Sequence, residues 1–122
     1  MSHDRTHVVM LFHSKLQRWL QPGGHADGEG NLAAVALREA MEETGLTGLS
    51  VVLPAIDLDV HEIPERGAEP AHLHLDLRYL LLAPADAHLE GNHESQDLRW
   101  VPVAEVEGLG VDDGLLLSLI HI

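Results

Sequence analysis

Residues 23–46 read GGHADGEGNLAAVALREAMEETGL, a glycine-rich loop followed by a segment with the pattern of a helix. Asn31 is a favourable N-cap residue, and residues 32–44 contain neither glycine nor proline. Gly45 stands where a left-handed residue closes many helices. Glycines let a ligand approach the backbone closely, which favours a binding loop ahead of the helix. The loop glycines are Gly23, Gly24, Gly28 and Gly30.

Three glutamates share one face of this predicted helix. Glu39, Glu42 and Glu43 are spaced i, i+3 and i+4, so their carboxylates project from the same side. Like charges at this spacing mildly destabilise a bare helix, whereas a hard divalent cation prefers such oxygen ligands. A solvated acidic face is the alternative interpretation. An apolar stripe is expected to face the core, and it consists of Leu32, Val35, Ala36 and Ala40.

The whole stretch resembles the Nudix hydrolase signature. That signature is a glycine, five residues, a glutamate, seven residues, Arg-Glu, an apolar residue, any residue, Glu-Glu, any residue, glycine and an apolar residue. Gly24 matches the first glycine, and Arg38–Leu46 matches the second half at every position. The early glutamate falls on Gly30, with Glu29 one residue before it. Arg38 is then expected to pair with Glu29 or with another acid, or to be held less firmly.

The resemblance implies a fold, an activity and a cofactor. The fold is an α/β/α sandwich, a mixed β-sheet flanked by helices, with residues 1–122 as a single domain. The activity is cleavage by water of the pyrophosphate bond of a nucleoside or other organic diphosphate, with Mg²⁺ or Mn²⁺. The alternative is a catalytically weak Nudix-like module that binds a nucleotide, which Gly30 favours. An isomerase on this fold would be expected to carry a nucleophilic cysteine, and the chain has none.

The resemblance also implies roles for the residues of the signature. Glu42 and Glu43 would be the primary metal ligands, and Glu39 would be a further ligand or the base that activates water. The carbonyl of Gly23 would be a backbone ligand. Arg38 would orient the carboxylates by ion pairing.

A further acid is expected from the late part of the chain. In the family an acidic residue shortly before a strand that contains Trp often completes the metal site. Glu94 is the best match ahead of Trp100, and Asp97 is the second. An ordinary charge in a loop is the alternative interpretation.

Composition limits the classes of partner. The chain has 20 acidic and 7 basic residues, and its formal net charge is −13. This charge argues against a nucleic-acid polymer or an anionic membrane as partner. The chain has no cysteine, and its N-terminal residues form no apolar leader. The lack of cysteine and of an apolar leader predicts a cytoplasmic protein without a membrane partner, and the family resemblance implies a small-molecule diphosphate as its substrate.

The N-terminal region predicts one buried strand, Thr6–His13. Nudix domains usually have another strand before it, but only Met1–Arg5 precede it here. A missing first strand would leave an exposed sheet edge, which invites a homodimer. The turn that follows carries Lys15 and Arg18, and they are interpreted either as solvated charges or as contacts to a substrate phosphate.

Two long segments, Leu49–Ile63 and Ala71–Ala83, predict a β-hairpin. In the second segment alternate residues share a face, so His72, His74 and Asp76 lie on one side. That face is interpreted as a plain polar surface, as a substrate-binding surface with His72 and His74, or as a transition-metal site. Residues two apart on a strand are about 7 Å apart, so one ion would need a ligand from elsewhere.

The C-terminal region predicts a short strand, Leu98–Val103, and a helical turn, Val103–Leu109. Asp112 and Asp113 are expected to cap a last helix, Gly114–Ile120, that covers one face of the sheet.

Overall fold

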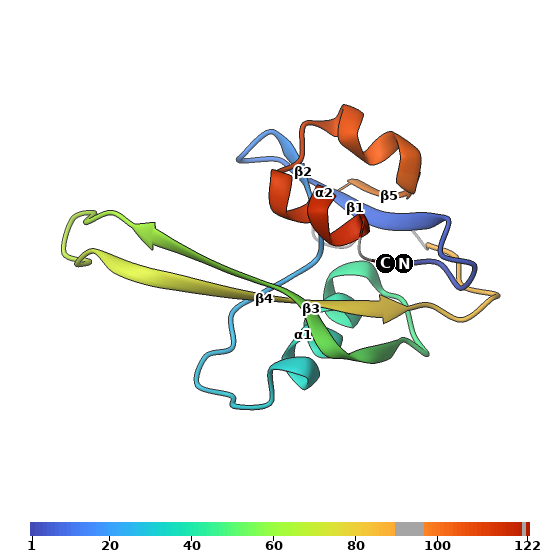
Figure 1. Cartoon of the computed structure of the whole chain (residues 1–122), viewed down its shortest axis with the longest axis horizontal. Coiled ribbons are helices and arrows are strands. Elements are labelled where there is room, and N and C mark those ends of the chain that lie inside the picture. The colour runs from blue at the N-terminus through green and yellow to red at the C-terminus, as the bar shows by residue number, and fades with distance from the viewer. Residues whose placement is uncertain (90–96, 121) are drawn as a thin grey trace.

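The computed structural model describes residues 1–89, 97–120 and 122. Within this part of the chain the named strands form two antiparallel sheets (Figure 1). The first sheet has the order β2-β1-β5, and the second is the hairpin β3-β4. The strands are β1 (His7–His13), β2 (Arg18–Leu20), β3 (Ser50–Ile63), β4 (His72–Leu82) and β5 (Asp97–Pro102).

The expected mixed sheet is not formed by these named strands, because every pair among them is antiparallel. Two of the pairs are joined by short connections, which return the chain in the opposite direction. A parallel contact occurs at Met1. Its amino group donates to the Leu81 carbonyl at 2.9 Å, and its own carbonyl accepts from the Ala83 N–H at 2.9 Å. Met1 thus bonds to both neighbours of Leu82, which is the hydrogen-bond pattern of a parallel pair.

The helix α1 (Leu32–Thr44) has the predicted bounds and the predicted caps. The Asn31 side chain accepts a hydrogen bond from the Ala34 N–H at 3.1 Å, which satisfies one free donor of the first turn. Gly45 takes a φ of 73° and donates its N–H to the Met41 carbonyl at 2.9 Å. Both ends of α1 are therefore fixed by residues next to it in the sequence.

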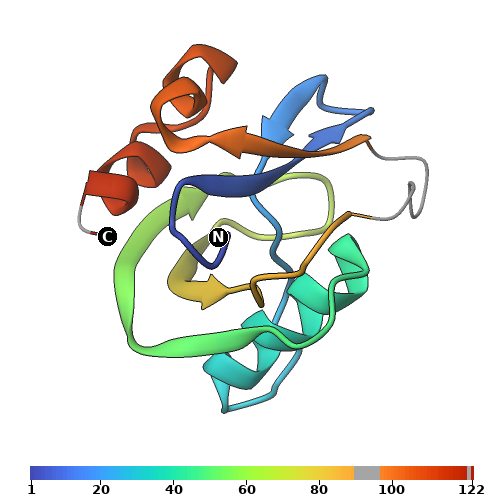
Figure 2. The same cartoon turned by 90° about the vertical axis from the view of Figure 1, so that its right-hand side faces the viewer.

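The core of the first sheet lies under the C-terminal helices η1 (Val103–Leu109) and α2 (Asp113–Ile120) (Figure 2). Asp112 caps α2 as predicted, because its carboxylate accepts from the Leu115 N–H at 2.8 Å. None of the helices in the described part of the chain is long and apolar enough to cross a membrane. The buried residues of this core are Met10, Val101, Val106 and Leu115.

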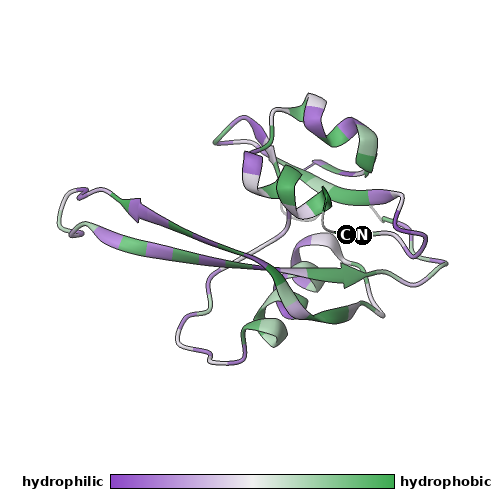
Figure 3. Ribbon diagram, viewed as in Figure 1, coloured by the Kyte–Doolittle hydropathy of each residue, from purple (hydrophilic) through white to green (hydrophobic). Residues whose placement is uncertain are grey.

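The hairpin has a packed inner part and a projecting outer part. The inner pairs, such as Val52 with Leu80, lie beside α1. The register shifts between Val52 and Asp57, and beyond this irregularity the hairpin extends away from the rest of the molecule (Figure 1). Polar and apolar residues alternate along it (Figure 3). The exposed large apolar residues beyond the register shift are Leu58, Val60, Leu73, Leu75 and Leu77.

Candidate active site

The glycine loop closes against α1 through Glu39. A Cβ atom on Gly24 would lie 2.5 Å from Cδ of Glu39 and 2.6 Å from its Oε2, so only glycine fits there without a shift. The Glu39 side chain is 20% exposed, and Arg38 Nη2 lies 3.6 Å from its Oε1. A half-buried carboxylate thus rests on the loop backbone beside one guanidinium.

A second contact joins the loop to Glu43. The Gly23 N–H donates to Glu43 Oε2 at 3.0 Å. Glu43 is partly buried, whereas Glu42 is exposed on the same side of the helix. The three glutamates therefore occupy the junction of α1 and the loop, with Gly23 within hydrogen-bonding distance of one of them.

The donor set at this junction fits a hard divalent cation. Its side-chain ligands are carboxylate oxygens, which Mg²⁺ prefers, and the exposure of Glu42 leaves room for water. Nitrogen or sulfur ligands, which select softer metals, are not among the candidate residues of this helix face. Glu39, Glu42 and Glu43 would hold the ion.

Gly30 lies in open space. A Cβ atom there would meet no atom within 4 Å, and Gly30 is not among the glycines with positive φ. Glu29 accepts from the Asn31 N–H at 2.9 Å, so it supports the start of the helix. Arg38 was expected to pair with Glu29 or with another acid. In the structure it pairs with another acid, Glu39.

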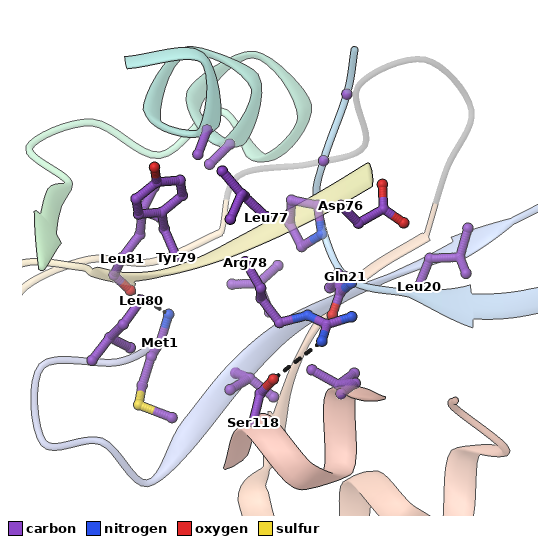
Figure 4. Close-up of a pocket in the computed structure, with 18 of the residues that line it drawn as sticks. Met1, Leu20, Gln21, Asp76, Leu77, Arg78, Tyr79, Leu80, Leu81 and Ser118 are labelled. Atoms are coloured by element: carbon purple, nitrogen blue, oxygen red, sulfur yellow. Dashed lines mark hydrogen bonds between the residues drawn. The ribbon is translucent and has the colours of Figure 1, made fainter. Parts of the chain in front are cut away.

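A cavity of about 650 Å³ lies beside the junction, with walls from β1, β4, α1 and α2 (Figure 4). The amino group of Met1 lies in its wall, and burial lowers the pKa of that group to about 6. This volume is in the usual range for small-molecule sites. The predicted apolar stripe of α1 faces the cavity with Leu32, Val35, Ala36 and Ala40.

Arg78 and Gln21 line this cavity, and neither was predicted as a site residue. Arg78 Nη1 donates to Asp57 at 2.8 Å and to Ser118 at 3.1 Å, the latter drawn in Figure 4. Within the described part of the chain, Arg78 Nε and Gln21 Oε1 are buried without a hydrogen-bond partner. Alternation along β4 puts Arg78 on the same face as His74 and Asp76, but its burial involves Ser118 of α2, which is 40 residues away along the chain.

The predicted substrate-binding residues fall into two groups. Arg18 and His74 line the cavity. Lys15 is exposed in the turn between β1 and β2, His72 is exposed at the start of β4, and neither is among the residues that line the cavity.

The late acid predicted for the metal site is not placed by the structure. Glu94 belongs to residues 90–96, which lie outside the described residues. Asp97, the second candidate, begins β5 and accepts from Arg99 at 3.1 Å.

Comparison with known proteins finds similarity to Nudix proteins both in sequence and in structure. A family model described as the NUDIX domain matches residues 2–117. A Nudix hydrolase from M. smegmatis, RenU, has a TM-score of 0.64 and 22% identity, over 94% of this chain and 71% of that one. None of the curated proteins matches the chain in sequence.

Other solved structures share the fold at low identity. A MutT structure, from work on Aliivibrio salmonicida and Vibrio cholerae, has a TM-score of 0.61 and 16% identity, over 99% and 90% of the two chains. An Ap4A hydrolase from C. elegans has a TM-score of 0.58 and 19% identity, over 94% and 81%.

Proposed function

The chain belongs to the Nudix family, and from this premise we propose that it hydrolyses the pyrophosphate bond of a nucleoside or other organic diphosphate with a divalent cation. The observation that carries the proposal is the junction of loop and helix. Glu39 rests on Gly24, and Glu43 accepts from Gly23. Both contacts join the two halves of the signature, so the carboxylates are held where a metal-bound pyrophosphate can reach them.

The proposed roles follow the positions of the side chains. Glu42 and Glu43 hold the metal, and Glu39 is a further ligand or takes the proton of the attacking water. Arg38 fixes Glu39 through their 3.6 Å ion pair. Bound Mg²⁺ or Mn²⁺ would balance charge on the phosphoryl oxygens and favour ionisation of water. Water attacks one phosphorus, and the bond from that phosphorus to the bridging oxygen breaks.

The cavity is proposed to hold the organic part of the substrate. Its apolar wall on α1 suits a flat or hydrocarbon group. Arg18 and His74 are proposed to contact phosphate oxygens at the cavity wall. Arg78 Nε and Gln21 Oε1 are buried without a hydrogen-bond partner beside the cavity, and a shift of these side chains on substrate binding is proposed to bring them to polar atoms of the substrate.

The net charge of −13 matters for such a substrate. An acidic protein repels an anionic diphosphate, so the divalent cation must first reverse the local charge at α1. The proposal includes a cytoplasmic setting, for which the lack of cysteine is the support. The comparisons with known proteins do not support a homodimer.

The alternative is a nucleotide-binding module with little turnover. It is favoured by Gly30, which replaces one carboxylate of the signature. Binding with no release of phosphate would support this alternative.

The test is a screen of nucleoside diphosphate derivatives, dinucleoside polyphosphates and other organic diphosphates, each with Mg²⁺, with Mn²⁺ and with chelator. Release of phosphate, pyrophosphate or nucleoside monophosphate is measured. Turnover that needs a cation is expected for at least one class. Glu65→Gln, in the exposed hairpin loop, is the matched control for variants of α1. Absence of turnover across the panel, together with tight nucleotide binding, would contradict the hydrolase proposal and support the nucleotide-binding module.

A further inference from the structure

A second group of metal-ligating side chains lies on the polar face of the outer hairpin. The strand register pairs His61 with His74 and Asp59 with Asp76, so all four side chains project from the same face. His61, His74 and Asp76 each offer a ligand atom, and these three atoms lie within 4.8 Å of one another. The sequence alone placed only His74 and Asp76 on one strand face, and the register adds the ligand from elsewhere that one ion would need.

One ligand atom from each residue lies within 4.8 Å of the other two, and the shorter distances between these side chains involve both nitrogens of each ring, so ring rotations are needed to form a tetrahedral site. Zinc–nitrogen bonds of about 2.0–2.1 Å place neighbouring tetrahedral ligands about 3.3 Å apart. His61 Nε2 and His74 Nδ1 are already 3.2 Å apart. Asp76 Oδ1 lies 3.7 Å from His74 Nε2, and Asp76 Oδ2 lies 3.8 Å from His61 Nδ1. Small rotations about the side-chain bonds would bring one atom of each residue onto a single ion.

The exposure and charge of this face also suit an ion from solvent. The side chains of His61, His74 and Asp76 are 43%, 39% and 48% exposed, so a hydrated ion can reach them. Asp59 Oδ2 lies 3.9 Å from His61 Nδ1 and adds a second negative charge. A metal-bound histidine is commonly held by a carboxylate at its other nitrogen, which Asp59 can provide.

We propose that His61, His74 and Asp76 bind a transition metal of the zinc class, with the fourth position open to water or to an oxygen of a ligand. Imidazole nitrogens favour Zn²⁺, Cu²⁺ or Ni²⁺, whereas the oxygen set of α1 favours Mg²⁺ or Mn²⁺. The two sites therefore take different classes of metal, and this inference does not depend on the proposed hydrolase activity.

The site borders the cavity and the glycine loop. His74 and Asp76 line the cavity, and Asp76 is drawn at its wall in Figure 4. The ring of His25, from the loop, lies 5.8 Å from the ring of His74 between centroids. An ion held here would add positive charge to the cavity wall, close to His25 of the loop.

The test is a zinc titration of the untagged full chain against a chromophoric chelator, which gives stoichiometry and affinity. The variants are His61→Gln, His74→Gln and Asp76→Asn. His72→Gln is the matched control, because His72 is exposed on the same face of β4 but outside the cluster. A Glu42→Gln, Glu43→Gln double variant controls for zinc at α1. Circular dichroism without metal checks that each variant is folded.

The expected result is one zinc ion per chain, with affinity lowered about tenfold or more in each cluster variant. The control variants are expected to keep the parent affinity. Cobalt in place of zinc is expected to give the strong visible absorption of a four-coordinate ion. Absence of stoichiometric zinc binding, equal affinity in the cluster variants and the parent, or loss of the ion in the α1 double variant would each overturn the proposal.

Discussion

The carboxylates of α1 and the histidines of the outer hairpin are both clusters of metal-ligating side chains, but the chain assembles them differently. The glutamates lie within five consecutive residues, and helical periodicity alone puts them on one face. His61 and His74 are 13 residues apart and meet only through the register of β3 with β4. The first cluster can be predicted from the sequence, whereas the second depends on how two strands align.

The two clusters also differ in chemistry and in support. The α1 cluster is all oxygen and is fixed by the loop through Gly23 and Gly24. The hairpin cluster is mainly nitrogen and lies on a projecting element, with exposed side chains. Perturbations aimed at one cluster should therefore leave the other intact, and the following predictions use this independence.

The largest effect is expected from removing charge at α1. In the Glu42→Gln, Glu43→Gln double variant, turnover of the substrate found by the screen should fall by about 100-fold or more, because direct ligands matter more than the outer-shell partners of a metal. Steady-state kinetics at saturating Mg²⁺ measures this. Turnover equal to that of Glu65→Gln would exclude these residues from catalysis.

A smaller effect is expected from Gly24→Ala. The added Cβ meets Glu39 at 2.5 Å, so the carboxylate or the loop must shift. Overpacking of this kind costs about 1–3 kcal/mol, and thermal unfolding should show it as a lower Tm. Gly23→Ala is the matched control, since a Cβ there meets nothing within 4 Å. Equal unfolding temperatures for the two variants would argue against the close packing of Glu39 on Gly24.

Magnesium itself should stabilise the protein without substrate. Carboxylates about 4 Å apart repel by about 1 kcal/mol in water and by about 4 kcal/mol near a protein surface, and a bound dication relieves that repulsion. At ten times its dissociation constant the ion adds about 1.4 kcal/mol, or a few degrees in Tm.

Sodium chloride at matched ionic strength is the control for this experiment, because screening alone relieves a protein with a net charge of −13. The double variant of α1 should lose the specific magnesium shift. An equal shift from both salts, unchanged in the double variant, would mean that this helix holds no specific site.

The smallest effect is expected from Gly30→Glu, which restores the carboxylate of the signature. Because Gly30 has open space and no positive φ, the fold should accept the side chain. Magnesium affinity should rise severalfold, since a further acid lies near the ion. Calorimetric titration of both proteins measures it, and unchanged or weaker affinity in a folded variant would contradict the prediction.

Local signals explain why part of the fold was predictable. Asn31 and Gly45 fixed the bounds of α1, and Asp112 fixed the start of α2, because caps act within a few residues. The alternation in Ala71–Ala83 gave the two faces of β4 for the same reason.

Long-range contacts explain what the sequence did not give. The resemblance implied a mixed sheet, whereas the pairing of the named strands is antiparallel and the parallel contact involves Met1. The burial of Arg78 required Asp57 and Ser118, from β3 and α2. The outer hairpin projects beyond the register shift between Val52 and Asp57, which the sequence pattern did not predict.

The most direct test of the account is to locate the hard cation by NMR. Mn²⁺ added in small amounts to ¹⁵N-labelled protein broadens the amide signals of nearby residues, and Mg²⁺ in excess should reverse it. A specific site at α1 predicts that broadening centres on Gly23, Gly24 and residues 39–43, and that the signals of His61 and His74 broaden less at the same Mn²⁺ concentration. Broadening centred on the outer hairpin, or spread evenly over the acidic surface, would contradict a specific metal site at α1.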